Sequence, residues 1–580
     1  MQHIKDTEKF CLIKEVAHTE VILTDSLSKV IEKFDIVGCF SAFNVLKSRG
    51  YAISSLFKTC LILPFAQVAS IYAMLKHGIS QGLAAKKDAY YAAKNNEFMD
   101  WRRLLYMVAS RFRQLVGKEI NDDQKRVTAL IFDDTLLEKT GKGIERVSLT
   151  FDHVSKRYVL GYKLLMCAFW DGISLIPLDF TLHRERGSKQ EEIINHYHRA
   201  NKALTQTKGQ LKHIHNQLDK HKRSQSLAIA KAESGFVITN HKLQKNAQSK
   251  CQILEAEILV LENQMVLDTK AMEDAKQKLK RMYSHGTLFG LKQSERKAQY
   301  RKVISAKSCG YTRRKESDRS KGSQLIAMLK RAVKHHFIPQ YVLTDSWFFS
   351  ESLIAGVKSV RNGAIELISM VKINNQVFEL DSDKKLIGVQ ALLKTCLSKK
   401  PRVCKQFHAS YHKVHCLYKG IPVNLFFIKM GRSSNWHLLA TTDLNLNFVN
   451  LMKIYQIRWG IEVFFHETKG YLNLGKCQSS NFDAQIADIT ITLMQYILLS
   501  YCKRIYYQTS FGELFRSLSA ERLRYNMLTK LLDIFWELVK ECSFSAGFDM
   551  IIIQRDIMQN PQMVTRIEKL MANTSFNNAA

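Results

Sequence analysis

Apolar residues recur at spacings of three and four along the first 120 residues of the chain. The spacing is clearest over residues 21–34, 42–48, 53–77 and 86–116. Apolar positions at this period form one face of a helix, which can then be buried. The pattern predicts an all-helical N-terminal region, residues 1–120, ahead of the first strand.

The pattern changes at Val127, where the run VTALIFDDT joins β-branched and apolar residues to two acids. A short apolar run of this kind is typical of a strand buried on both faces. Two more strands are predicted over residues 158–170 and 173–183, joined by the hairpin dipeptide Asp171-Gly172. The first strand of the core therefore ends in carboxylates, and the next two pair with each other.

A second strand that ends in an acid is predicted further along the chain. Residues 340–343 form a short apolar run, Asp345 follows it, and helical periodicity resumes over 350–360. A carboxylate at a strand end can be held rigidly in a cleft, as a metal ligand must be. Aspartate is also common in turns and at helix starts, so this position alone leaves both interpretations open.

A long insertion separates these two acid-bearing strands. Residues 188–335 are polar and helix-rich, and a seven-residue repeat that includes Ile258 and Met265 predicts a coiled-coil arm whose partner is the segment 200–221. Asp268 interrupts the apolar seam. Such an arm would grip DNA or a second protomer, or serve as a solvated spacer.

A second insertion, residues 374–443, shows the alternation of apolar and polar residues that predicts β-structure. Its last strand begins at Trp436. The cluster His408, His412 and His415 has the residue type of a metal site, but its spacing does not place all three on one face of a strand. We therefore discount a metal there.

Charge narrows the class of partner. The chain has 86 Lys and Arg against 53 Asp and Glu, a formal net charge of +33. Residues 201–330 alone hold 27 Lys and Arg against 11 Asp and Glu, and the run RRKESDRSK at 313–321 is predicted to be an exposed basic loop. This balance predicts a polyanionic partner.

Basic and aromatic side chains are mixed over residues 86–115. This mixture suits contact with a DNA backbone, and it suits a solvated helix face as well. The residues concerned are Tyr90, Tyr91, Trp101, Arg102, Arg103, Arg111 and Arg113.

The cysteines and the apolar runs indicate the cellular compartment in which the protein is expected. The 12 cysteines include no C-x2-C pair, which argues against a zinc module and predicts reduced thiols. No signal peptide is expected over residues 1–24, and the most apolar run, 59–75, contains Pro64 and Gln67. We expect a cytoplasmic protein that does not enter a membrane.

The stretch MKIYQIRWGIEVFFHETKGY, residues 452–471, carries the most specific candidate chemistry. Tyr455, Arg458, Glu462 and Lys469 lie at i, i+3, i+7 and i+14, so they share one face of a helix. A carboxylate between two cations suits metal-assisted phosphate chemistry, with Glu462 on the metal and the cations on phosphate oxygens. The alternative is a surface helix with an ordinary ion pair.

The pattern Y-x2-R-x3-E-x6-K resembles the signature of the IS4 family of DDE transposases without departure. The resemblance implies an α/β protein with an RNase H-like catalytic core, a mixed sheet, and two further acids upstream. The family's first aspartate precedes Thr or Ser, which selects Asp134 over Asp133. The second is Asp345. With Glu462 they would be the catalytic acids and would hold two Mg²⁺ ions, for which Mn²⁺ may substitute.

The resemblance also implies a substrate. It predicts cleavage and strand transfer of the terminal inverted repeats of an insertion sequence into double-stranded target DNA, by cut-and-paste transposition. Tyr455, Arg458, Lys469 and Trp436 would contact DNA, with Trp436 stacked on an unpaired base. The expected enzyme is a homodimer when bound to DNA and is associated with a bacterial nucleoid.

Seven segments follow from these observations. They are residues 1–120, helical and DNA-end-binding; 121–187, 336–373 and 444–505, the parts of the core; 188–335, the basic helical insertion; 374–443, the β-rich insertion; and 506–580, a C-terminal helical region.

Two other functions fit the same features: a metal-dependent nuclease of this fold that does not join DNA, and a basic DNA-binding protein whose acids are structural.

Overall fold

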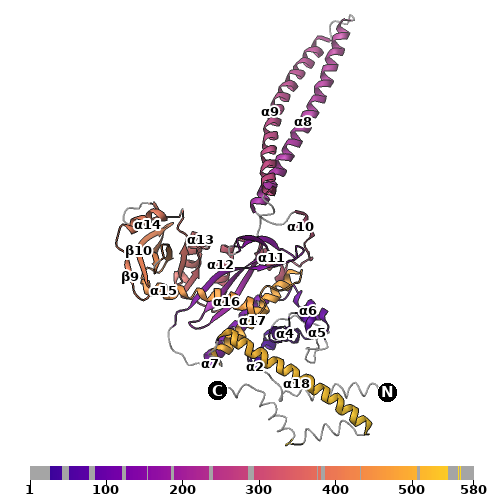
Figure 1. Ribbon diagram of the computed structural model, residues 1–580. Coiled ribbons are helices and arrows are strands. Elements are labelled where there is room, and N and C mark those ends of the chain that lie inside the picture. The colour runs from indigo at the N-terminus through magenta and orange to yellow at the C-terminus, as the bar shows by residue number, and fades with distance from the viewer. Residues whose placement is uncertain are drawn as a thin grey trace. The chain divides into compact units, whose positions relative to one another are not determined.

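The computed structural model describes residues 26–41, 51–68, 70–76, 85–119, 126–152, 155–184, 188–233, 240–284, 293–374, 376–380, 386–431, 433–505, 510–546, 560 and 562 (Figure 1). The chain divides into two compact units. The first comprises Met1–Arg146, Tyr162–His183 and Tyr300–Ala580, and the second comprises Val147–Gly161 and Arg184–Gln299.

The strands of the described residues form one mixed sheet, in the order β2-β3-β1-β5-β6-β12-β11-β10-β7-β8, with β4 paired to β3 and β9 to β10. The strands are β1 (Ala129–Glu138), β2 (Ser148–Asp152), β3 (Arg157–Trp170), β4 (Leu175–His183), β5 (Tyr341–Thr344), β6 (Glu366–Val371), β7 (Val377–Glu379), β8 (Leu386–Gly388), β9 (Arg402–Cys404), β10 (Ala409–Tyr418), β11 (Ile421–Met430) and β12 (Trp436–Thr441). Strands β1, β5 and β6 run parallel, and β12 is antiparallel to β6.

The predicted hairpin is present between β3 and β4, where Trp170 pairs with Leu175. The short strand β2 was not predicted, because its five residues are too few to show a clear alternation. An α/β class with a mixed sheet is therefore confirmed, and the parallel strands β1 and β5 place both predicted acid-bearing strand ends at one edge of the sheet.

Helices dominate the N-terminal part, as the apolar spacing predicts. They are α2 (Ser26–Lys33), α3 (Ile36–Ser41), α4 (Ile53–Ile62), α5 (Ile71–Lys76), α6 (Lys87–Lys94) and α7 (Trp101–Glu119). The long apolar helix α17 (Phe482–Ile505) packs against α7, α4 and β4, and α18 (Phe511–Ser545) follows it. Among the described helices, none combines the length and the apolarity needed to cross a membrane.

Several basic and aromatic side chains of residues 86–115 make contacts within the protein. Trp101 and Tyr90 are buried in the core. Arg102 pairs with the carboxylates of Asp179 and Glu316, at 2.9 and 2.7 Å. Arg113 donates to the carbonyl oxygen of His336 at 2.7 Å. The partners of these side chains lie in parts of the chain far away in sequence, and DNA contact by the N-terminal helices stays a prediction.

The expected basic loop at 313–321 is also absent. In its place are the end of α11 (Cys309–Ser317) and the start of α12 (Lys321–Lys334). Arg313 and Arg314 are 7% and 5% exposed. Arg314 forms ion pairs with Glu145 at 2.6 Å and with Asp483 at 2.7 Å. The run looked solvated because its counter-charges come from other elements.

Asp179 of β4 is the centre of this buried network. Its carboxylate meets Arg102, Arg331 and Arg313, at 2.9, 2.7 and 3.8 Å. Burial by itself would raise the pKa of Asp179, but the three guanidinium groups lower it to about 2. The network ties α7, α11 and α12 to the sheet, since each of these helices contributes an arginine.

The predicted coiled-coil arm is confirmed within the second unit. Helices α8 (Ser188–Glu233) and α9 (Asn240–Ser284) lie side by side along their length (Figure 1). Their seam is apolar and consists of Leu211, Leu218, Cys251 and Ile258, with Ile214, Leu254, Leu261 and Met265 against them. Asp268, which interrupts this apolar seam, has a hydrogen-bond partner across it, because the Thr207 hydroxyl donates to its carboxylate at 2.7 Å.

Candidate active site

The register of β1 and β5 brings two aspartates to one sheet edge. Phe132 pairs with Thr344, so the next residues, Asp133 and Asp345, leave the paired region at the same level. Asp345 is fixed by a backbone N–H of the following turn, since Trp347 donates to its Oδ1 at 3.0 Å. Helix α13 (Glu351–Lys358) then begins, capped by the hydroxyl of the preceding serine.

The signature stretch forms two helices instead of one. Helix α15 (Phe448–Gln456) ends and α16 (Trp459–Tyr471) begins around Arg458, where backbone hydrogen bonds shorten to an i to i−3 pattern. The tight turn leaves Tyr455 facing the sheet, and its hydroxyl donates to the carbonyl oxygen of Thr344 at 3.3 Å. Ile461 and Phe464 bury the other side of α16.

Arg458 joins the two helices to the acids. Its Nη1 lies 3.1 Å from Asp133 Oδ2, and its Nη2 donates to Glu462 Oε1. Lys469, further along α16, donates to the Thr135 hydroxyl at 2.7 Å. All four residues of the signature therefore point toward the ends of β1 and β5, as their helical spacing predicts.

The adjacent aspartates of β1 point in opposite directions. Side chains alternate along a strand, so Asp133 and Thr135 share the face that α16 covers. Asp134 lies on the other face, where it forms an ion pair with Lys321, the first residue of α12. The Lys321 ammonium also sits 4.8 Å from the centre of the Trp347 ring. The structure thus brings Asp133, and not Asp134, onto the side of Glu462.

Crowded negative charge shifts the pKa values of this cluster. Burial and, next, the charge of Asp345 raise the pKa of Asp133 to about 7, although Arg458 opposes the shift. Burial also raises the pKa of Asp345, with a contribution from Asp134. The pKa of Tyr455 is raised to about 12, chiefly by burial, so its phenol stays protonated as a hydrogen-bond donor.

The cluster has the chemistry of a cation site with Arg458 inside it. In the described part of the chain, no group of three or more His, Cys, Asp or Glu is arranged to hold a metal ion. The carboxylate oxygens are nevertheless the donors that Mg²⁺ prefers, and a cation would relieve the repulsion that raises the pKa of Asp133. The donor type of these residues suits a divalent metal, although the described carboxylates are not arranged around a metal position in this structure.

Trp436 does not lie beside Glu462. One row of paired residues crosses the sheet at the level of Phe132 and consists of Phe132, Thr344, Ser369, Ala440, Leu425 and Val414. Trp436 is four residues from Ala440, so it shares the face of Phe132 and Asp134, opposite to Asp133. Its ring packs against His412, with the centroids 5.6 Å apart. Its stacking on DNA stays a prediction.

The resemblance favoured Asp134 over Asp133, and no local pattern singled out Lys321. A double aspartate at a strand end offers one acid to each face, and the choice between them depends on which face the distant helix α16 covers. Lys321 lay in a stretch predicted to be a loop.

The comparisons with known proteins bear on part of the chain. No protein with a curated description matches the chain. Residues 301–498 match a family model described as Transposase DDE domain. That range includes Asp345 and the whole signature stretch, but neither aspartate of β1. The match supports a DDE transposase, an enzyme of the polynucleotidyl transferase and endonuclease type that acts on DNA and generally depends on a divalent metal.

Proposed function

We propose that the chain is an IS4-type transposase that cleaves the ends of an insertion sequence and joins them to target DNA. The observation that carries the proposal is the approach of the signature helix to the two aspartate-bearing strand ends. The Arg458 guanidinium contacts both Asp133 and Glu462, residues that lie 325 and 4 positions away from it. A structural ion pair would not require the remaining signature residues to face the same strand ends.

In this proposal Asp133, Asp345 and Glu462 hold the Mg²⁺ ions. The bound metal supplies an activated water or 3′-hydroxyl and stabilises the leaving oxygen during displacement at phosphorus. Arg458 and Lys469 neutralise phosphate oxygens near the scissile bond, and Tyr455 holds the turn against Thr344. Asp134 has a positioning role, since it orients Lys321 on the opposite face.

The remaining parts of the proposal concern the assembly. The enzyme excises its element by cut-and-paste transposition as a homodimer on DNA, and the N-terminal helices bind the terminal repeats. The seven segments given above are its proposed domains. These points rest on the resemblance of the signature and on the basic charge of the chain.

The test uses purified full-length protein and a DNA duplex that carries the sequences flanking its coding region. The wild type should nick and then join these ends in Mg²⁺, and Glu462→Gln should do neither while it binds the duplex as tightly as before. Glu467→Gln, on the same helix, is the matched control and should keep both activities. Cleavage without joining would instead indicate a nuclease. Binding without any Mg²⁺-dependent cleavage would indicate a DNA-binding protein, and either result overturns the proposal.

A further inference from the structure

The β-rich module, which we define as β7 to β12 with α14 (Val389–Leu397), is predominantly basic, and the acidic residue within these elements is Glu379 of β7. Between residues 384 and 442 the sequence has 11 Lys and Arg and no Asp or Glu. Elsewhere in the protein, buried arginines meet carboxylates of the same chain, as Arg314 does. From residue 386 to 442 these cations have no acidic neighbour in sequence, so a polyanion from outside is a natural source of counter-charge.

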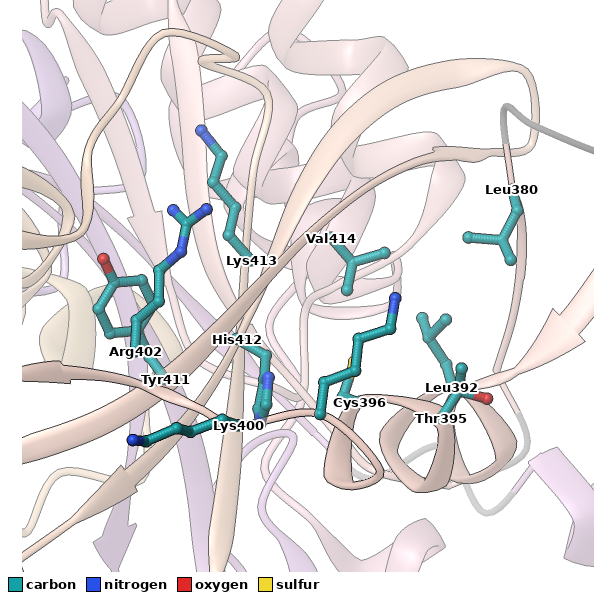
Figure 2. Close-up of a pocket in the computed structure, with 11 residues that line it drawn as sticks. Leu380, Leu392, Thr395, Cys396, Lys400, Arg402, Tyr411, His412, Lys413 and Val414 are labelled. Carbon is teal, nitrogen blue, oxygen red and sulfur yellow. The ribbon is translucent and has the colours of Figure 1, made fainter.

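A pocket of about 310 Å³ lies in this module, between α14 and the strands β9 and β10. None of its 11 lining residues is acidic (Figure 2). Lys399 and Lys400 follow α14, Arg402 begins β9, and the side chains of all three are exposed. Lys413 contributes less, because its ammonium faces the carbonyl oxygens of Leu444 and Leu446.

The interior of the pocket contains one polar group without a protein partner. His412 is 9% exposed, and its Nε2 atom is buried and makes no hydrogen bond within the described structure. The neighbouring lining is apolar and includes Leu392 and Val414. A buried imidazole nitrogen in such surroundings is costly unless a ligand supplies the missing partner. A phosphate oxygen can accept from an Nε2–H, and the exposed cations Lys399, Lys400 and Arg402 at the pocket rim attract a phosphate.

We propose that this pocket is a second DNA-contact site, which binds phosphates of a duplex backbone away from the acidic cluster. The proposal rests on DNA being the substrate. Phosphate contacts of this kind position a duplex without reading its sequence. The β-rich module would therefore hold the DNA while the acids at the ends of β1 and β5 act on it.

The test measures duplex binding by the full-length protein as a function of salt. The probe is a 40-base-pair duplex of arbitrary sequence, roughly four helical turns. Each phosphate contact contributes about 0.9 to the slope of log K against log salt, so K399Q/K400Q/R402Q should lower the slope by about two to three. His412→Phe should weaken binding several-fold, and His412→Gln, which keeps a hydrogen-bonding group, should restore part of it.

The matched control removes the same charge elsewhere. K202Q/K208Q/K212Q changes three exposed lysines of α8 and should leave the slope closer to wild type. An equal loss in both triple variants would show only a net-charge effect and would overturn the proposal, as would an unchanged slope. If K399Q/K400Q/R402Q lowered the salt slope for single-stranded RNA but not for the duplex, the pocket would be an RNA site. That result would also contradict the proposal. None of these readings requires cleavage, so failure of the proposed catalytic function would be seen separately, as a wild-type protein that binds but does not cut.

Discussion

The Arg458 guanidinium donates to the Asp133 carboxylate at an Nη1 to Oδ2 distance of 3.1 Å, across 325 residues of sequence. The same guanidinium holds Glu462, so it occupies the space in which carboxylates from β1 and α16 would share a cation. Metal binding and this ion pair therefore compete. In the proposed mechanism, a metal held by the carboxylates would leave Arg458 free to pair with a negatively charged phosphate of the DNA.

The competition predicts that Arg458→Gln binds divalent metal more tightly in the absence of DNA. Hydrogen bonds to charged groups contribute roughly 1.5 to 3 kcal/mol, and part is lost to solvent at this partly buried site, so we expect about a tenfold gain in affinity. Calorimetric titration with Mn²⁺ measures it, and Lys469→Gln serves as the control. An unchanged or weaker affinity in Arg458→Gln would show that the guanidinium does not block the metal.

The raised pKa of Asp133 predicts a pH-dependent stability in metal-free protein. Its pKa of about 7 exceeds the usual value of an aspartate, so between about pH 4 and 7 the folded state holds a proton that the unfolded state releases. The contribution of Asp133 to the free energy of unfolding is therefore present at low pH and is lost as the pH rises through about 7. Asp133→Asn should then raise the melting temperature at pH 8 and leave it nearly unchanged at pH 4. Equal effects at both pH values would contradict the shift.

The buried network around Asp179 makes a prediction about stability alone. Asp179→Asn leaves three arginines without their shared carboxylate, and breaking a buried ion pair from one side typically costs about 3 to 5 kcal/mol. Urea denaturation followed by tryptophan fluorescence should show a much lower midpoint. Asp318→Asn, in a more exposed pair with Arg146, should change it little. If the two variants behave alike, the network is not the tie between helices and sheet that its geometry suggests.

Lys469 offers a test of phosphate contact near the acids. Its ammonium lies on the Thr135 side of the cluster, so Lys469→Ala should slow cleavage and lower the salt slope of end binding by about one. Gel-shift titrations at several salt concentrations give the slope. Full activity with an unchanged slope would assign Lys469 to a structural role.

Much of this arrangement could be predicted from local patterns. The spacing from Glu462 to Lys469 is a helical period, and α16, which packs through Ile461 and Phe464, presents that face to the strand ends. The strand before Asp345 and the coiled-coil seam are also local. Each of these features depends on residues close together in sequence.

The rest depended on contacts that no local pattern contains. The run at 313–321 looked like a loop because Arg313 and Arg314 find their carboxylates on β4, after β1 and in α17. The choice between Asp133 and Asp134 depends on which helix covers each face of β1. Trp436 is separated from Glu462 by the pairing of four strands, so its sequence distance from the signature gave no guide to its position.

The most direct test of the central claim compares the neighbouring acids of β1. Single-turnover cleavage of the flanking DNA ends in Mg²⁺ should fall by at least about a thousandfold in Asp133→Asn, since loss of a metal ligand removes several kcal/mol of transition-state stabilisation. Asp134→Asn should keep most of its activity, and both variants should bind DNA like the wild type. The opposite result, with Asp133→Asn active and Asp134→Asn inactive, would contradict an active site on the α16 face.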